Sequence, residues 1–322
     1  MGAVLRKSVL LALLFLCCVP HAARAAVTVL VGEPFDSLGT MIPVGHVTIY
    51  LDRVCADGPL KVRMCQPGEP AGVAIARYDL IQYDWLATPI MQFLYATDRT
   101  DEVLSYATKS QVDGLRAQYR ERYLKQAFPD SSVVLKSNEE WWESSGMAYT
   151  RSLWGFQIAT TRAQDERVVA VLNSRPNRHI YDAYHANCAN FAAELLNLYV
   201  PNLVKRNRFA DLGFLLPKQV ARCVYSYGTK HPDAHLRVFR IPQVPGSIRR
   251  SRPVRGGAEA FLKTKRYIAP LSIIQPEIAA ILLGIYLDKG RWTPNRPVEI
   301  ESPEAFLQAS EPTTARNDRP KS

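Results

Sequence analysis

Apolar and polar residues alternate in several short stretches of this chain, and such alternation predicts β-strands. Residues 44–52 are the clearest case. One side of this stretch carries Val47, Ile49 and Leu51, and the other, more polar side carries His46. Shorter alternating or apolar runs predict strands at residues 26–31, 73–76, 150–159 and 237–241. We therefore expect a sheet, with His46 on the more polar face of one of its strands.

A different spacing, with apolar residues three and four positions apart, predicts helices. The segments that fit are residues 110–127, 161–172, 188–200 and 215–225, with a short helical turn at 138–143. In the third segment Cys188 lies at the start of the helix, next to Asn187 and Asn190. Phe191, Leu195 and Tyr199 share the face of Cys188. We expect this face, including the thiol, to point toward the sheet.

The elements between residues 26 and 245 are expected to form one α+β domain. Proline, glycine and arginine then become frequent, so residues 246–301 are interpreted as a basic linker followed by an apolar helical extension. Residues 267–287 are strongly apolar but contain Pro270, Pro276 and Glu277, which favours a buried or interfacial segment over a membrane-spanning helix. The composition of residues 302–322 predicts a disordered tail.

The first 25 residues have the pattern of a secretory signal peptide. Two basic residues, Arg6 and Lys7, precede an apolar run, and Ala23-Arg24-Ala25 is a small-x-small cleavage site. Cleavage after Ala25 leaves 297 of the 322 residues and lowers the formal net charge from +10 to +7. We therefore predict an exported protein of the periplasm or cell envelope.

The remaining positive charge is spread along the chain and is densest between Arg249 and Arg266. An exported basic protein meets anionic lipids and wall polymers, and no nucleic-acid-binding motif accompanies the charge. Nucleic acid is therefore not an expected partner. Lys263, Lys265 and Arg266, which flank the apolar segment, allow contact with a membrane surface through residues 249–287.

Four cysteines remain after the signal peptide, in a compartment that favours disulfides. Cys55 and Cys65 lie on either side of the turn residues Asp57-Gly58-Pro59, so we predict that they form a disulfide. Cys188 and Cys223 then either pair with each other or stay free, because four cysteines allow three pairings.

Cys188 at a helix start and His46 on a strand are a candidate nucleophile and base. A helix N-terminus and a nearby imidazole both favour the thiolate, which is the reactive form of cysteine. Taken singly, each residue also fits a structural role, Cys188 as a small core residue and His46 as a hydrogen-bonded one. Spacing alone does not separate these alternatives, because only geometry identifies a dyad.

The order Gly45-His46 on a strand, then Asn187-Cys188 at a helix start, resembles the circularly permuted branch of the NlpC/P60 papain-like thiol enzymes. Phe156-Gln-Ile-Ala-Thr-Thr-Arg-Ala-Gln, Tyr181-Asp182 and Asn187-Cys188 are together similar to the periplasmic Lnb N-terminal domain family, which is DUF4105-like. The similarity spans about residues 40–200. It implies a permuted papain-like domain in which an antiparallel sheet packs on helices.

The resemblance also implies chemistry, with Cys188 as nucleophile and His46 as general base of an acyl-enzyme mechanism. Asn187, Asn190, His185 and Tyr184 are the candidates for cleft lining or oxyanion support. The implied function is a cell-envelope cysteine hydrolase or acyltransferase that acts on an amide or ester, in a peptidoglycan peptide or in a lipid or lipoprotein acyl group. The alternative is a non-catalytic envelope protein that keeps the fold as a binding scaffold.

A third residue that would orient His46 is not evident in the sequence. Asp52 shares its strand face but lies about 20 Å away along the strand. His179 and Arg63 are weaker candidates than His185 and Tyr184 for lining the cleft, and His231 and His235 fit loops. No ligand spacing indicates a metal, and nothing in the sequence calls for a cofactor.

Overall fold

The computed structural model describes residues 25–35, 44–69, 72–78, 83–125, 144–178, 182–207, 209, 211, 213–295, 298–302 and 306. Its centre is a seven-stranded sheet in the order β6-β5-β2-β1-β7-β8-β9. The strands are β1 (Ala26–Gly32), β2 (His46–Leu51), β5 (Val73–Ala76), β6 (Leu86–Pro89), β7 (Leu153–Ala159), β8 (Arg237–Ile241) and β9 (Glu299–Ile300). All neighbours are antiparallel except β8 and β9, so the sheet is mixed rather than purely antiparallel. The α+β class is confirmed.

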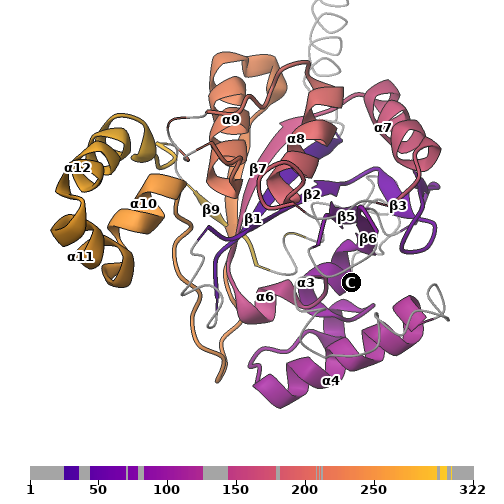
Figure 1. The fold of residues 1–322 in the computed structure, drawn as a ribbon. Coiled ribbons are helices and arrows are strands. Elements are labelled where there is room, and N and C mark those ends of the chain that lie inside the picture. The colour runs from indigo at the N-terminus through magenta and orange to yellow at the C-terminus, as the bar shows by residue number, and fades with distance from the viewer. Residues whose placement is uncertain are drawn as a thin grey trace, which may run out of the picture.

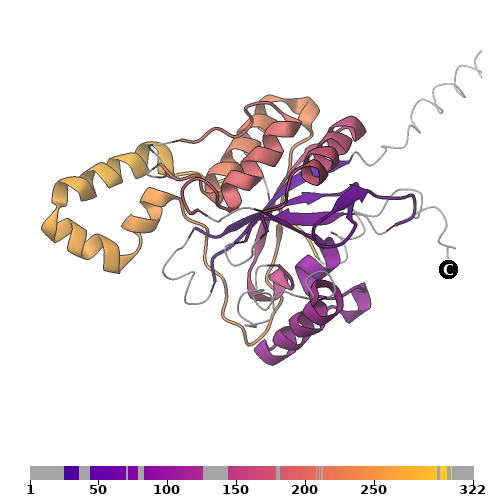
Figure 2. The same cartoon turned by 45° about the vertical axis from the view of Figure 1, so that its right-hand side comes forward.

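Helices cover both faces of this sheet (Figures 1 and 2). One face, which we call the α8 face, receives Val47 and Ile49 and packs against α7 (Arg162–Ser174), α8 (Cys188–Tyr199) and α9 (Pro217–Lys230). The opposite face, the α3 face, receives Leu30 and Tyr50 and packs against α3 (Ile90–Tyr95), α4 (Lys109–Tyr119) and α6 (Met147–Thr150). Short helical turns occur at η1 (Thr100–Glu102), η2 (Arg120–Leu124) and η3 (Pro232–Ala234).

This second helical layer corrects one expectation about His46. The alternation along β2 is as predicted, but every residue of β2 is buried, including His46. The more polar face of the strand is therefore not open, because α3, α4 and α6 cover it. Strand alternation identified two sides and could not tell that both are packed.

Most element boundaries agree with the sequence within a few residues. β5 and β8 coincide with the predicted strands, and α7 starts after Thr161, whose side chain forms a capping box with Gln164. The predicted strand at residues 150–159 starts later, at Leu153, because α6 runs through Thr150. The turn predicted at residues 138–143 lies outside the described residues.

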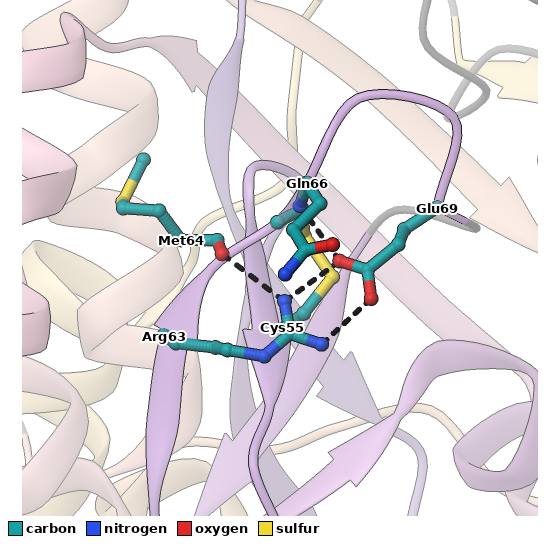
Figure 3. The surroundings of a disulfide bond; sticks show 6 residues. Cys55, Arg63, Met64, Gln66 and Glu69 are labelled. Carbon is teal, nitrogen blue, oxygen red and sulfur yellow. Dashed lines mark hydrogen bonds and ion pairs between the residues drawn. A yellow bond between two sulfur atoms is a disulfide. The ribbon is translucent and has the colours of Figure 1, made fainter.

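A small hairpin, β3 (Val54–Ala56) and β4 (Val62–Met64), follows β2 and carries the predicted disulfide between Cys55 and Cys65. Figure 3 shows its surroundings. Arg63 forms a two-pronged ion pair with Glu69, at 2.7 and 2.6 Å, and holds the pKa of that carboxyl down at about 2. Arg63 is thus committed to the hairpin and lies outside the candidate site.

The C-terminal part forms a helical appendage of α10 (Gly257–Leu262), α11 (Lys265–Ile274), α12 (Pro276–Ile285) and η4 (Tyr286–Gly290). It extends away from the sheet on one side of the molecule (Figures 1 and 2). In the described part of the chain no helix is long and apolar enough to cross a membrane.

Phe306 is a described residue within the segment predicted to be a disordered tail. Its ring is buried on the α3 face between Tyr50 and Phe239, with centroid distances of 5.6 and 5.5 Å. The other residues after Ser302 lie outside the described part of the chain. A single aromatic residue in a polar segment gives no periodic signal, which is why its burial was not predicted.

Candidate functional site

Cys188 is the first residue of α8, as predicted, because Asn187 caps the helix. The Asn187 side-chain oxygen accepts the Asn190 N–H at 2.9 Å, and the Asn190 side-chain oxygen accepts the Asn187 N–H at 3.3 Å. This reciprocal capping box satisfies amide groups that a helix start leaves without intrahelical acceptors. The thiol of Cys188 is buried, with 8% of the residue exposed, on the face that also carries Phe191 and Leu195.

Asn187 also ties the helix start to two neighbouring segments. Its Nδ2 donates to the carbonyls of Ala183 at 2.7 Å and Leu215 at 3.1 Å. Both amide hydrogens and the oxygen are therefore engaged, so Asn187 holds the helix in place and has no donor left for an oxyanion. The amide N–H groups of the first turn and the positive end of the helix dipole remain beside Cys188.

His46 begins β2, and its imidazole stacks on Tyr78, with ring centroids 5.3 Å apart and ring planes inclined by 8°. Gly45 before it has φ +74° and passes so close to the Gly32 carbonyl that an added Cβ would lie 2.4 Å from that oxygen. Gly45 is therefore needed for the close approach of the Gly32 backbone.

His46 lies on the α3 face of the sheet. It is the direct partner of Gly32 across β1 and β2, and directly paired residues point to the same side. A Cβ built on Gly32 would lie 2.8 Å from the Arg151 side chain and 3.4 Å from Met147, both on the α3 side. Because Cys188 packs on the α8 face, the sheet lies between the imidazole and the thiol.

The two residues nevertheless lie at the same end of the sheet. Phe191, in the first turn of α8, lies beneath the Arg77 guanidinium at 5.3 Å. Arg77 follows β5 directly and precedes Tyr78, the residue that stacks on His46. The start of α8 is thus next to the start of β2.

The other end of α8 confirms this direction. Tyr199, its last residue, donates its hydroxyl to Asp165 at 3.0 Å, and Asp165 also accepts from Arg53, which follows the end of β2. Helix α8 therefore runs along β2 in the same direction (Figure 1). Cys188 and His46 occupy equivalent ends of these two elements on opposite faces of the sheet.

Arg77 is a residue of this region that sequence reasoning missed. It is only 4% exposed and is paired with Asp84, whose carboxylate accepts from Arg77 Nε at 2.6 Å. Among the described residues its Nη1 has no hydrogen-bond partner. The signal was present, because Arg77 continues the inward alternation of Val73 and Ile75 with a charged residue.

The loop before α8 places the other candidates away from the thiol. Asp182 accepts the N–H groups of Tyr184 and His185, both at 2.7 Å, and fixes the turn. The His185 side chain is 72% exposed and 3.7 Å from Asp182. The Tyr184 ring packs on Phe214, with 5.1 Å between centroids. Neither contact places these two side chains over Cys188.

The remaining candidates have structural surroundings or lie outside the described residues. His231 bonds the Tyr227 carbonyl at 2.9 Å, and His235 lies in the loop that follows, as expected. His179 is not among the described residues. In the described ranges no three His, Cys, Asp or Glu side chains gather as a metal site requires.

Cys188 and Cys223 are both free thiols, so the alternative of a second disulfide is not realised. Cys223 lies in the wall of a cavity of about 640 Å³ at the base of the helical appendage, with Lys205, Arg222 and Trp292. Burial raises the pKa of the Cys223 thiol, which disfavours its reactive form. Cys188 and His46 do not line this cavity.

Comparison with family models, with curated proteins and with solved structures found no match to this chain.

Proposed function

We propose that this protein is an exported cysteine hydrolase or acyltransferase of the cell envelope, with Cys188 as its nucleophile. The observation that carries the proposal is the position of Cys188 at the capped start of α8, at the end of the sheet where β2 begins with His46. A thiol at a helix N-terminus is favoured as thiolate by the dipole and by the free amide groups of the first turn. A permuted papain-like fold of the NlpC/P60 type remains part of this proposal.

The expected chemistry is acyl transfer through a thioester. The Cys188 thiolate attacks the carbonyl carbon of an amide or ester, and the amine or alcohol leaves with a proton. Water or a second acceptor then displaces the acyl group and restores the thiol. The oxyanion formed in each step needs two donors. We assign these to the backbone N–H of Cys188 and to Nη1 of Arg77, which is buried at the same end of the α8 face.

The role of His46 as general base carries a structural requirement. Its imidazole is on the α3 face, so proton exchange with Cys188 requires the side chain to turn around the start of β2, or a water that bridges the end of the sheet. Removal of the imidazole should then lower the rate by about 10²–10⁴-fold, the usual contribution of general acid–base catalysis.

Labelling with a thiol-directed acyl probe tests this proposal. Wild type, Cys188→Ala, His46→Ala and Arg77→Met are compared. Cys223→Ser is the matched control, because Cys223 is the other free thiol among the described residues. We expect no labelling of Cys188→Ala, slow labelling of His46→Ala and Arg77→Met, and unchanged labelling of Cys223→Ser. Equal labelling of all variants would refute the assignment.

A binding scaffold without catalysis is the second candidate function, and one observation favours it. The sheet separates the imidazole of His46 from the thiol of Cys188. Labelling that is absent in Cys188→Ala but proceeds at the wild-type rate in His46→Ala would show that Cys188 is merely a reactive thiol. A binding scaffold would then be the better description of the protein.

We further propose that the protein works at an anionic membrane surface through the hairpin of α11 and α12. Ile273 and Ile274, where the two helices meet, are 82% and 75% exposed. Between residues 267 and 287 the only charged side chain is Glu277. Lys265 and Arg266 lie at the base of α11. The exposed isoleucines can insert into the headgroup region of a membrane, while Lys265 and Arg266 contact anionic lipids.

Flotation with vesicles tests the membrane contact. Vesicles of phosphatidylcholine with and without phosphatidylglycerol are mixed with wild type and with the double variant Ile273→Ser/Ile274→Ser. Each buried isoleucine contributes about 1.5–3 kcal/mol, so we expect the double variant to bind at least about a hundredfold more weakly. Ile300→Ser is the control, because Ile300 is exposed on β9. Equal flotation of the double variant and the control would exclude the hairpin as the contact.

A further inference from the structure

The first strand of the sheet begins with a contact between the backbone and a buried carboxylate. The amide nitrogen of Ala26 donates to Asp52 Oδ2 at 2.7 Å. The other oxygen of Asp52, Oδ1, is buried and has no hydrogen-bond partner among the described residues. The Ala26 amide therefore serves one oxygen of a carboxylate whose other oxygen has room for a donor.

The surroundings of Asp52 carry more negative than positive charge. Asp165, on α7, lies nearby and is 2% exposed. Arg53 bonds Asp165 at 2.9 Å and is, among the described residues, the one cation beside the two carboxylates. Tyr199 contributes its neutral hydroxyl to Asp165. With both carboxylates ionised, this group has a net charge of −1. A single additional positive charge would balance it.

Residue 26 is the position at which the sequence places the new N-terminus, directly after Ala23-Arg24-Ala25. We propose that the mature chain begins at Ala26 and that its α-ammonium group forms a buried ion pair with Asp52. This inference rests on the proposed export of the protein. An ammonium group has three hydrogens where the amide has one, so it can satisfy both Asp52 oxygens and supply the missing charge.

The chemical step is hydrolysis of the Ala25–Ala26 amide by a signal peptidase. Water supplies the hydroxyl that leaves Ala25 with a carboxylate, and the Ala26 nitrogen departs as an amine that takes up a proton. Cleavage removes one neutral hydrogen bond, from the Thr160 N–H to the Ala25 carbonyl at 2.7 Å. It replaces the neutral bond to Asp52 by charge-assisted ones, which are about twice as strong. The exchange therefore favours the cleaved chain.

Two measurements test the inference. In the first, the 322-residue chain is expressed in a bacterium that exports it, and the exported protein is analysed by N-terminal sequencing and intact mass. We expect a chain that begins with Ala26. A chain that begins at any other residue, or one that keeps its first 25 residues, would overturn the inference.

The second measurement does not depend on export, so its failure is distinct from failure of the proposed location. The chain with a free Ala26 is compared with the same chain carrying a Gly-Ser extension, by urea unfolding at pH 7. We expect an unfolding equilibrium constant about tenfold lower for the free chain. The difference should vanish in Asp52→Asn, which keeps an acceptor, and persist in the control Asp57→Asn on the exposed β3–β4 turn. Equal constants for the two chains, or a difference that survives in Asp52→Asn, would show that no such ion pair forms.

Discussion

The imidazole of His46 lies flat against the ring of Tyr78, its neighbour across β2 and β5, with 5.3 Å between the ring centroids. The stack fixes the imidazole plane at the end of the sheet where α8 begins. Tyr78 is therefore the best candidate for the third residue that the sequence did not reveal. In the proposed mechanism its role would be to position His46.

Replacement of Tyr78 tests this positioning role. An aromatic pair contributes about 0.5–1.5 kcal/mol, so Tyr78→Ala should slow acyl-probe labelling of Cys188 by up to about tenfold. It should also shift the pH profile of labelling, because the surroundings of the imidazole change. Tyr78→Phe keeps the stacked ring and should behave like wild type. If Tyr78→Ala lowers the melting temperature but leaves the pH profile in place, Tyr78 is only a core residue.

Removal of the helix cap should loosen the start of α8. Asn187→Ala deletes the bonds to Asn190, Ala183 and Leu215. We expect the free energy of unfolding to fall by about 1–2 kcal/mol, as for other N-cap losses. The rate of Cys188 alkylation should also change, since the thiol lies in the first turn of α8. Asn187→Ser, which can still cap, is the control, and equal stability of both variants would contradict the role of the cap.

The disulfide of the β3–β4 hairpin should contribute modestly to stability. Cys55 and Cys65 are ten residues apart, and a loop of that size is expected to contribute about 2–3 kcal/mol. Cys55→Ser/Cys65→Ser should lower the free energy of urea unfolding by that amount in the absence of reductant. With dithiothreitol present, wild type and variant should unfold together. A loss of the same size in Cys223→Ser would show that the effect is not specific to the disulfide.

Asp52 should make stability depend on pH in the chain that is extended before Ala26. Burial raises the pKa of Asp52 to about 7, above its value of about 3.8 in the unfolded chain. The folded state therefore binds the proton more tightly, and stability is greatest below about pH 4, falls up to about pH 7 and is level above it. The total loss is roughly 4 kcal/mol at most.

Urea unfolding between pH 4 and 8 measures this slope. We expect Asp52→Asn to reduce the pH dependence of stability. Part of the dependence should remain because burial also raises the pKa of Asp165. The chain with a free Ala26 should show a smaller slope, because its ammonium group favours the ionised form of Asp52. An unchanged slope in Asp52→Asn would mean that other groups determine the pH dependence.

Local patterns predicted a large part of the fold. Alternation in residues 44–52 predicted β2, and apolar positions three and four apart predicted α8 with Cys188 first. These features depend on a residue and its near neighbours, because hydrogen bonds and side-chain direction within one element repeat with a fixed period. The pairing of Cys55 with Cys65 was also accessible, since a short turn joins them.

The apolar segment at residues 267–287 was predicted in part. Pro276 does divide it, as Pro at the first helical position of α12, and α11 ends at Ile274. The sequence favoured a buried or interfacial segment here. In the described part of the chain, α11 has no buried residue. A periodic apolar pattern gives no information on whether the surface it creates will find a partner inside the same chain.

What the sequence by itself determined is the order of His46 and Cys188 and their places at the starts of a strand and a helix. Tertiary structure alone decided that helices cover both faces of the sheet, so that imidazole and thiol share one end but not one face. It also brought Arg77 beside Phe191 and the nitrogen of Ala26 to Asp52. Alternation assigns a side chain to one of two sides. Which element covers each side depends on packing between segments that are distant in the chain. The spacing of residues within one segment does not predict that packing.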